Sequence, residues 1–161
     1  MKRTFLVVAV VLGLSVGLRA QMQHVDVKDA KGNSVGMAMI SAGKSGGVSI
    51  ALDVKGLPPG DHALHLHANG VCEPPFTSAG GHFNPGNKKH GMQNPEGHHA
   101  GDMMNFTVAK DGTSKTTVNN ADVTMQTVGA LALVIHATAD DMKTDPSGKA
   151  GDRIACGVVP K

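Results

Sequence analysis

The sequence predicts an all-β protein, and three observations indicate this class. Apolar residues alternate with polar ones in short runs, as at Ile50, Leu52 and Val54. Turns rich in Gly, Pro and Asn separate the runs, and no segment after residue 20 shows a convincing helical period. Period-two alternation between turns is typical of antiparallel strands with one buried face. We therefore expect about eight strands in a sandwich or barrel.

The early strands are defined by their alternating apolar residues, which we expect to face the core. Met37 and Met39 belong to this pattern, and copper-binding thioethers are the less favoured interpretation of them. The alternating residues are Val25 and Val27, then Val35, Met37 and Met39, then those of the run 48–54.

The alternation continues over residues 63–68, where it places His65 and His67 on one face and Leu64 and Leu66 on the other. Residues 69–104 then lose all periodicity. A stretch of this length without regular structure is uncommon in a compact domain unless it is functional.

The last third of the chain returns to strands. A turn at 110–112 between two short β-prone runs predicts a hairpin. A buried strand over 131–135 leads directly into His136, and a final strand follows at 154–159. Between these two strands, residues 139–152 form a polar loop.

The N-terminus reads as a secretory signal peptide. A positive start at 1–3 precedes the apolar run 5–18, and Ala20 offers a small residue at the expected cleavage site. The run is short for a membrane span. We therefore expect a signal peptide over 1–20, a single domain over 21–161, export to the periplasm or beyond, and no stable membrane insertion after cleavage.

The net charge of the chain after residue 20 is close to zero. Residues 1–20 carry three of the 15 Lys and Arg and none of the 13 Asp and Glu, so the remaining chain has a net charge of −1. Bulk charge thus gives no indication of a nucleic-acid partner.

In an exported chain, Cys72 and Cys156 predict a disulfide, with free thiols or metal ligation as alternatives.

Histidines are concentrated between Gly60 and Asp102, where seven of the chain's nine occur. Neutral imidazole is the commonest metal ligand, suited to zinc, copper, iron or nickel. Four N/O donors within about twenty residues suffice for a closed tetrahedral zinc site. These are His82, His90, His99 and Asp102.

A second group, His65, His67 and His136, lies on expected strands. Three histidines leave a coordination position open for water or substrate, as catalytic sites require. From these residues alone, a zinc hydrolase, a copper redox site and a metal carrier all remain open.

The residues from about Gly60 to the C-terminus resemble the copper–zinc superoxide dismutase family, and the motifs occur in the family's order. The full set is highly specific, although HxH alone is weak. The matching segments are HALHLH at 62–67, SAGGHFNP at 78–85, KHG at 89–91, HAGD at 99–102, VIHATADD at 134–141 and AGDRIACG at 150–157.

The resemblance implies two metal sites that share one imidazole. His65, His67, His82 and His136 would bind copper. His82, His90, His99 and Asp102 would bind zinc.

The resemblance also implies roles for residues around the metals. Asp140 would hydrogen-bond a ligand histidine of each metal, and His62 would pack beneath the copper site without ligating. Arg153 would stand at the mouth of the copper channel and hold the anion. The Cys72–Cys156 disulfide would tie the long loop to the last strand. The implied fold is a flattened Greek-key β-barrel with long metal-binding and electrostatic loops.

The implied activity is disproportionation of superoxide to dioxygen and hydrogen peroxide by a Cu(II)/Cu(I) cycle, with His82 bridging to zinc and carrying a proton. The alternative is a non-catalytic copper-binding or copper-delivery module on the same fold. Retention of the copper histidines and of Arg153 favours the enzyme. A zinc hydrolase would need an added general base, and none is evident. The resemblance allows a homodimer without requiring one.

Overall fold

The computed structural model describes residues 22–161, so the expected signal peptide lies outside the described residues. Its elements are short strands and one 3-10 turn, η1, which confirms the all-β class. In chain order they are β1 (Gln23–Asp29), β2 (Ser34–Ala42), β3 (Val48–Val54), β4 (Gly60–His62), β5 (Leu64–His67), η1 (Thr77–Ala79), β6 (Phe106–Val108), β7 (Ser114–Asn120), β8 (Ala132–His136) and β9 (Arg153–Val158).

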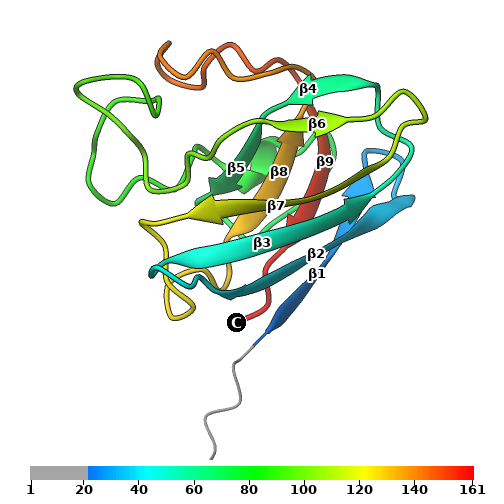
Figure 1. Cartoon of the computed structure of the whole chain (residues 1–161), viewed down its shortest axis with the longest axis horizontal. Helices are drawn as coiled ribbons and strands as arrows, with labels where there is room; N and C mark the ends of the chain where they lie inside the picture. Colours follow the sequence, from blue (N-terminus) through cyan, green and yellow to red (C-terminus); the bar gives the residue numbers. More distant parts are fainter. Residues whose placement is uncertain (1–21) are drawn as a thin grey trace, which may run out of the picture.

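Seven strands form one antiparallel sheet in the order β5-β8-β9-β1-β2-β3-β7, and β4 pairs with β6 separately. The sheet curls, so that β5, β8 and β9 lie behind β7, β3 and β2 in Figure 1. The β4–β6 pair lies along the upper side of this curled sheet. The arrangement is the flattened barrel that the sequence resemblance implied.

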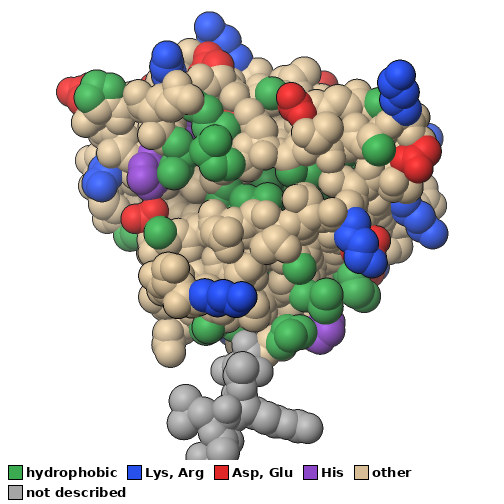
Figure 2. All heavy atoms as spheres, in the orientation of Figure 1, with side chains coloured by type: hydrophobic (Ala, Val, Ile, Leu, Met, Phe, Trp, Pro, Cys, Tyr) green, Lys and Arg blue, Asp and Glu red, His purple; other side chains and the backbone are tan. Residues whose placement is uncertain are grey.

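The core lies inside the curled sheet and is built by the alternating residues. Ile50 and Leu52 of β3 belong to the same buried cluster as Leu64 and Leu66 of β5 and Leu133 of β8. Burying each such side chain stabilises the fold by roughly 1.5–3 kcal/mol. On the face shown in Figure 2, Lys and Arg side chains are scattered among Asp and Glu rather than gathered in one patch.

The core assignment of Met37 and Met39 is wrong. Pairing of β1 with β2 shifts between Val27 and Lys28, so that Val35 is left out of the register. Such a bulge reverses the side-chain phase of the strand beyond it. Gly36 (φ +134°) allows this backbone, and a Cβ there would overlap the backbone of Asp53. Met37 consequently is 46% exposed and Met39 half-buried.

The predicted hairpin at 110–112 is also wrong in its pairing. The turn is present, with the Ala109 N–H donating to Thr113 O and the Gly112 N–H donating to Ala109 O. However, β6 pairs with β4 and β7 pairs with β3 along its whole length. The turn therefore joins the two sheets instead of two neighbouring strands, because the three residues of β6 find their partners on β4.

Two long connections leave the sheet and meet over β5 and β8: residues 68–105 and residues 137–152. The predicted disulfide is confirmed, since Cys72 is bonded to Cys156 of β9 with a Cα–Cα distance of 5.7 Å. Phe76 and Ala79 pack against Val134 and Cys156 in a second small apolar cluster. Across residues 22–161, no helix is long and apolar enough to cross a bilayer.

Candidate metal centre

Two neighbouring strands position three of the histidines. In the β5–β8 pair, His65 lies opposite Val134 and His67 opposite Ala132. Leu64 and Leu66 occupy the alternate positions and point into the core, so period two turns the histidines outward. His136 ends β8, and its backbone N–H donates to Ala63 O at 3.0 Å. Regular backbone pairing therefore determines the positions of these three rings.

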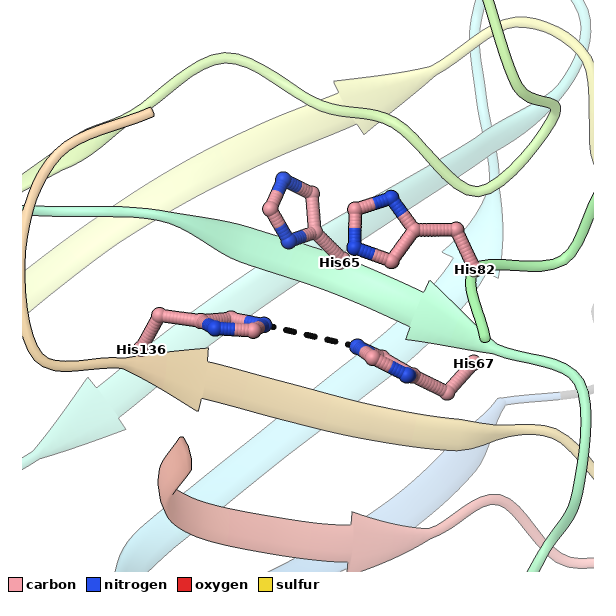
Figure 3. Close-up of side chains that lie close together, drawn as sticks. All are labelled: His65, His67, His82 and His136. Carbon is pink, nitrogen blue, oxygen red and sulfur yellow. Dashed lines mark hydrogen bonds between the residues drawn. The ribbon is translucent and has the colours of Figure 1, made fainter. Parts of the chain in front are cut away.

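His82 comes from the long loop and completes the first group. It forms an isolated bridge with His67 at the end of β5. One ring nitrogen each of His65, His67, His82 and His136 lies within 4.8 Å of the others. Figure 3 shows the four rings converging on a common point. All four side chains are buried.

The nitrogens that face this point have few protein partners. Within residues 22–161, His65 Nδ1 and His82 Nε2 are the buried side-chain polar atoms without a hydrogen bond. The Nε2 atoms of His67 and His136 lie 3.4 Å apart and face each other. Because buried polar atoms are normally satisfied, such atoms aimed at one point call for an ion.

The outward nitrogens of the same group are all occupied. His67 Nδ1 lies 2.9 Å from Gly80 O and His136 Nδ1 lies 3.3 Å from Gly151 O. His65 Nε2 lies 2.8 Å from Asp140 Oδ2. If these nitrogens donate, each inner nitrogen carries a lone pair directed at the common point.

Burial keeps these rings neutral. It lowers the pKa of His65 to about 4, that of His67 to about 2 and that of His136 to about 3. The positive charge of Arg153 adds to the effect of burial for His67 and His136. Neutral rings at pH 7 are ready to bind a cation without first losing a proton.

A second group shares His82 and lies deeper in the loop. Asp102 Oδ1 lies 2.8 Å from His82 Nδ1, 3.1 Å from His90 Nδ1 and 3.4 Å from His99 Nδ1. One oxygen or nitrogen of each of the four residues lies within 4.8 Å of the others. Three nitrogens and one carboxylate oxygen form the donor set of a closed tetrahedral zinc site.

The Asp102 carboxylate is held in its charged form. Burial raises its pKa, but hydrogen bonds from His82, His90 and the Gly91 N–H outweigh burial and bring the pKa far below its usual value. Its Oδ2 accepts the backbone N–H groups of Gly91 at 2.9 Å and His99 at 3.0 Å. The carboxylate therefore organises the loop around itself.

Asp140 connects the two groups. Its Oδ2 lies 2.8 Å from His65 Nε2 and its Oδ1 lies 3.0 Å from His90 Nε2. Burial lowers the pKa of His90, but hydrogen bonds to Asp102 and Asp140 outweigh it and raise that pKa to about 9. Burial alone would raise the Asp140 pKa, but hydrogen bonds from His65 and His90 keep it well below its usual value.

Arg153 begins β9 beside the first group. Its guanidinium donates to Phe76 O at 2.6 Å and to Gly80 O at 2.7 Å. Gly80 O also accepts from His67, so the arginine and a histidine of the first group share one carbonyl. The side chain is neither fully buried nor fully exposed. Its charge thus lies at the edge of the group, within reach of solvent.

The remaining histidines belong to neither group, although His62 contacts the backbone of the first one. His62 is buried, with ring nitrogens 2.8 Å from His136 O and 2.7 Å from Pro58 O. His98 pairs with Asp122 at 2.8 Å on the surface. His24 is exposed on β1.

Sequence reasoning missed several supporting residues. The amide side chain of Asn105 exchanges two hydrogen bonds with the backbone of Asp140. Asp145 accepts the backbone N–H of His90 at 2.8 Å. Gly148 (φ +63°) lies against Asp140, and a Cβ there would overlap the carboxylate. Only the glycine left a signal, a turn-like Pro-Ser-Gly at 146–148; the other two contacts depend on tertiary folding.

Comparisons with known proteins place the chain among its relatives. The family model described as copper/zinc superoxide dismutase matches residues 34–159. The chain is 47% identical over 146 residues to superoxide dismutase [Cu-Zn] 1 of Aquifex aeolicus, covering 84% of this chain and 86% of that relative. The Cu/Zn superoxide dismutase structure from Brucella abortus is similar, with a TM-score of 0.76, 30% identity and coverage of 86% and 99%. A superoxide dismutase-like protein from Bacillus subtilis is similar with a TM-score of 0.78, 37% identity and coverage of 84% and 97%.

Proposed function

The chain belongs to the copper/zinc superoxide dismutase family, and we propose that its two groups of side chains hold the copper and the zinc of that activity. The reaction consumes two superoxide anions and two protons and yields dioxygen and hydrogen peroxide. The observation that carries the residue assignment is that the two groups share one imidazole, that of His82.

We assign copper to His65, His67, His82 and His136. Four imidazole nitrogens suit this metal, and two of them lack any other partner within the described chain. Copper bound here would supply the one-electron chemistry, accepting an electron from one superoxide and returning it to a second. The outward hydrogen bonds to Gly80 O, Gly151 O and Asp140 orient the rings.

We assign zinc to His82, His90, His99 and Asp102. Zinc is not redox active, so its role here is to hold the loop and the shared ring. Asp102 supports this assignment, because its charged carboxylate already gathers three histidine nitrogens around one oxygen.

His82 is the residue to which we assign proton transfer. Its Nε2 faces the copper group and has no hydrogen-bond partner among residues 22–161. This atom can therefore take up a proton and pass it to the peroxide being formed. Its Nδ1 lies 2.8 Å from Asp102 Oδ1, among the residues assigned to zinc, so that group would hold the ring in place during the transfer.

We assign to Arg153 the attraction and orientation of the anionic substrate. Its guanidinium is anchored by Phe76 O and Gly80 O at the border of the copper group. A fixed positive charge beside the site attracts a small anion and orients it toward the metal. Superoxide dismutase is itself a standard example of such steering.

Export is proposed for the mature chain 21–161 after removal of 1–20. The Cys72–Cys156 disulfide supports an oxidising compartment, and bacterial relatives share the family. Mass spectrometry of the N-terminus, on protein recovered from the periplasm and the medium, tests the cleavage site and the compartment. A homodimer stays a prediction that light scattering on the purified chain will test.

Reconstitution tests the assigned function. The metal-free protein is reloaded with zinc alone, copper alone or both, and superoxide decay is followed by stopped-flow absorbance. We expect rapid decay only where copper is present. If copper binds stoichiometrically and decay stays at the zinc-only rate, the chain is a copper-binding module instead.

A further inference from the structure

The outer face of β1 and β2 carries an unusual set of side chains. The bulge beside Gly36 turns Met37 and Met39 away from the core. His24 of β1 is exposed on the same sheet. Figure 2 shows hydrophobic side chains gathered beside a histidine over the lower part of these strands. Outer faces of antiparallel strands normally carry polar residues, so two thioethers beside an imidazole need an explanation here.

The strand register brings the three donors together. His24 lies directly opposite Met39, and Met37 lies opposite Asp26, two residues further along β1. Side chains directly opposite have Cβ atoms about 4.5–5.5 Å apart, and diagonal neighbours lie about 7–8 Å apart. Methionine is unbranched with three rotatable bonds, so both thioethers can reach the His24 ring.

The local chemistry favours a soft ion over a hard one. The Asp26 carboxylate accepts from Ser34 Oγ at 2.8 Å and lies 3.5 Å from Lys28 Nζ, so it is already engaged. The donors that remain among these paired residues of β1 and β2 are two thioether sulfurs and one imidazole nitrogen. Thioethers select monovalent copper over zinc, calcium or magnesium.

We propose that His24, Met37 and Met39 form a surface site for a soft monovalent cation, Cu(I) or its analogue Ag(I). The site lies on β1 and β2, whereas the copper and zinc groups are built on β5, β8 and the long loops. It does not depend on the assignments made for those groups. His24 and Met37 are exposed and Met39 is half-buried, so a bound ion can exchange with solvent.

The test uses the full mature protein with copper and zinc already loaded, methionine methyl groups labelled with ¹³C, and Ag(I) as the added ion. We expect the Met37 and Met39 signals to shift together and to saturate at one equivalent of Ag(I). The exposed Met92 and Met104 provide an internal comparison, and their signals should stay in place at that point.

Three variants sharpen the test. His24→Gln and Met39→Leu should each weaken Ag(I) binding at least ten-fold, and both should leave superoxide decay unchanged. Met104→Leu is the matched control and should bind Ag(I) as the wild type does. Equal shifts of all exposed methionines, or unchanged affinity in His24→Gln, would overturn the proposal.

Discussion

The group that we propose for copper and the group that we propose for zinc, called the copper group and the zinc group below, differ in what positions their side chains. His65, His67 and His136 lie on or at the ends of paired strands, where backbone hydrogen bonds fix their positions before any ion is present. His90 and His99 lie in a loop with little regular pairing. The copper group is therefore positioned mainly by the strands of the barrel. The zinc group is positioned mainly by contacts among the side chains of the loop.

The zinc group compensates for missing backbone pairing with polar contacts. The Asp102 and Asp145 carboxylates accept backbone N–H groups, and the Asn94 amide donates to His90 O at 2.9 Å. A metal bound by four of the loop's side chains would add to these contacts. The strands therefore preform the copper group, while the loop, with the zinc proposed for it, would hold His82.

The largest expected effect comes from breaking the strand-borne group. His136→Ala removes one copper nitrogen and should lower copper-dependent superoxide decay by at least about 100-fold, more than the usual effect of changing a supporting residue. Zinc binding by the loop should be unchanged, as measured by competition with a chromophoric chelator. Parallel loss of zinc would mean that the two groups are not built independently.

Removing the covalent link between loop and barrel should have the next largest effect. A Cys72→Ser/Cys156→Ser variant should lower the free energy of unfolding by about 2–5 kcal/mol. Urea denaturation of the metal-free variant and wild type measures this difference. Wild type treated with a reductant is the control and should reproduce the variant. A loss below about 1 kcal/mol would show that the loop is held without the disulfide.

Asp140 touches both groups, so changing it tests their coupling. Asp140→Asn keeps the shape but removes the charge that faces His65 and His90. We expect zinc affinity to fall about 10–100-fold, as is usual for residues that orient metal-bound histidines. The exposed Asp122→Asn variant is the control. A zinc affinity equal to that of wild type would show that Asp140 does not orient the histidines proposed for zinc.

His90 and the three strand-borne histidines should respond to pH with opposite signs in the metal-free protein. Below pH 6.5, His65, His67 and His136 are protonated in the unfolded chain but stay neutral in the folded one. The free energy of unfolding therefore falls as pH drops toward 4. Each can contribute up to about 1.4 kcal/mol per pH unit. His90, with its pKa raised to about 9, stabilises below pH 6.5 and loses that contribution between 6.5 and 9.

Denaturant titrations of the metal-free protein between pH 4 and 9 measure this profile, which should have its maximum near pH 6.5. His67→Gln removes one of the three neutral rings and should flatten the acid side. A His90→Gln variant should flatten the alkaline side. Stability that rises steadily from pH 7 to pH 5 would contradict the burial argument.

The smallest expected effect concerns Arg153, which touches neither group as a ligand. Arg153→Ala should slow superoxide consumption by roughly ten-fold, at the lower end of electrostatic steering effects, and should weaken its dependence on salt. Arg153→Lys keeps the charge and should recover much of the rate. Equal rates of superoxide consumption for Arg153→Ala and wild type at low salt would show that Arg153 does not contribute to substrate capture.

The sequence predicted the strands, the histidine groups and the disulfide because each leaves a local signal. Alternation identified the run at 48–54, and the spacing of His65 and His67 placed both rings on one face. The prediction for Met37 and Met39 was wrong because of a bulge. A bulge exchanges the inward and outward positions of the residues beyond it and leaves no signal in the composition of the strand. The contacts of Asn105 with Asp140 join residues 35 apart in the chain, so no local pattern could indicate them.

The central claim is that one imidazole serves both metals, and magnetic resonance tests it most directly. Two Cu(II) ions that share the His82 ring interact magnetically. Protein with Cu(II) in both groups should therefore give a low-temperature EPR intensity far below two spins per chain, whereas the copper–zinc form should give one full spin. Two full, independent copper signals would contradict the shared ring and the account built on it.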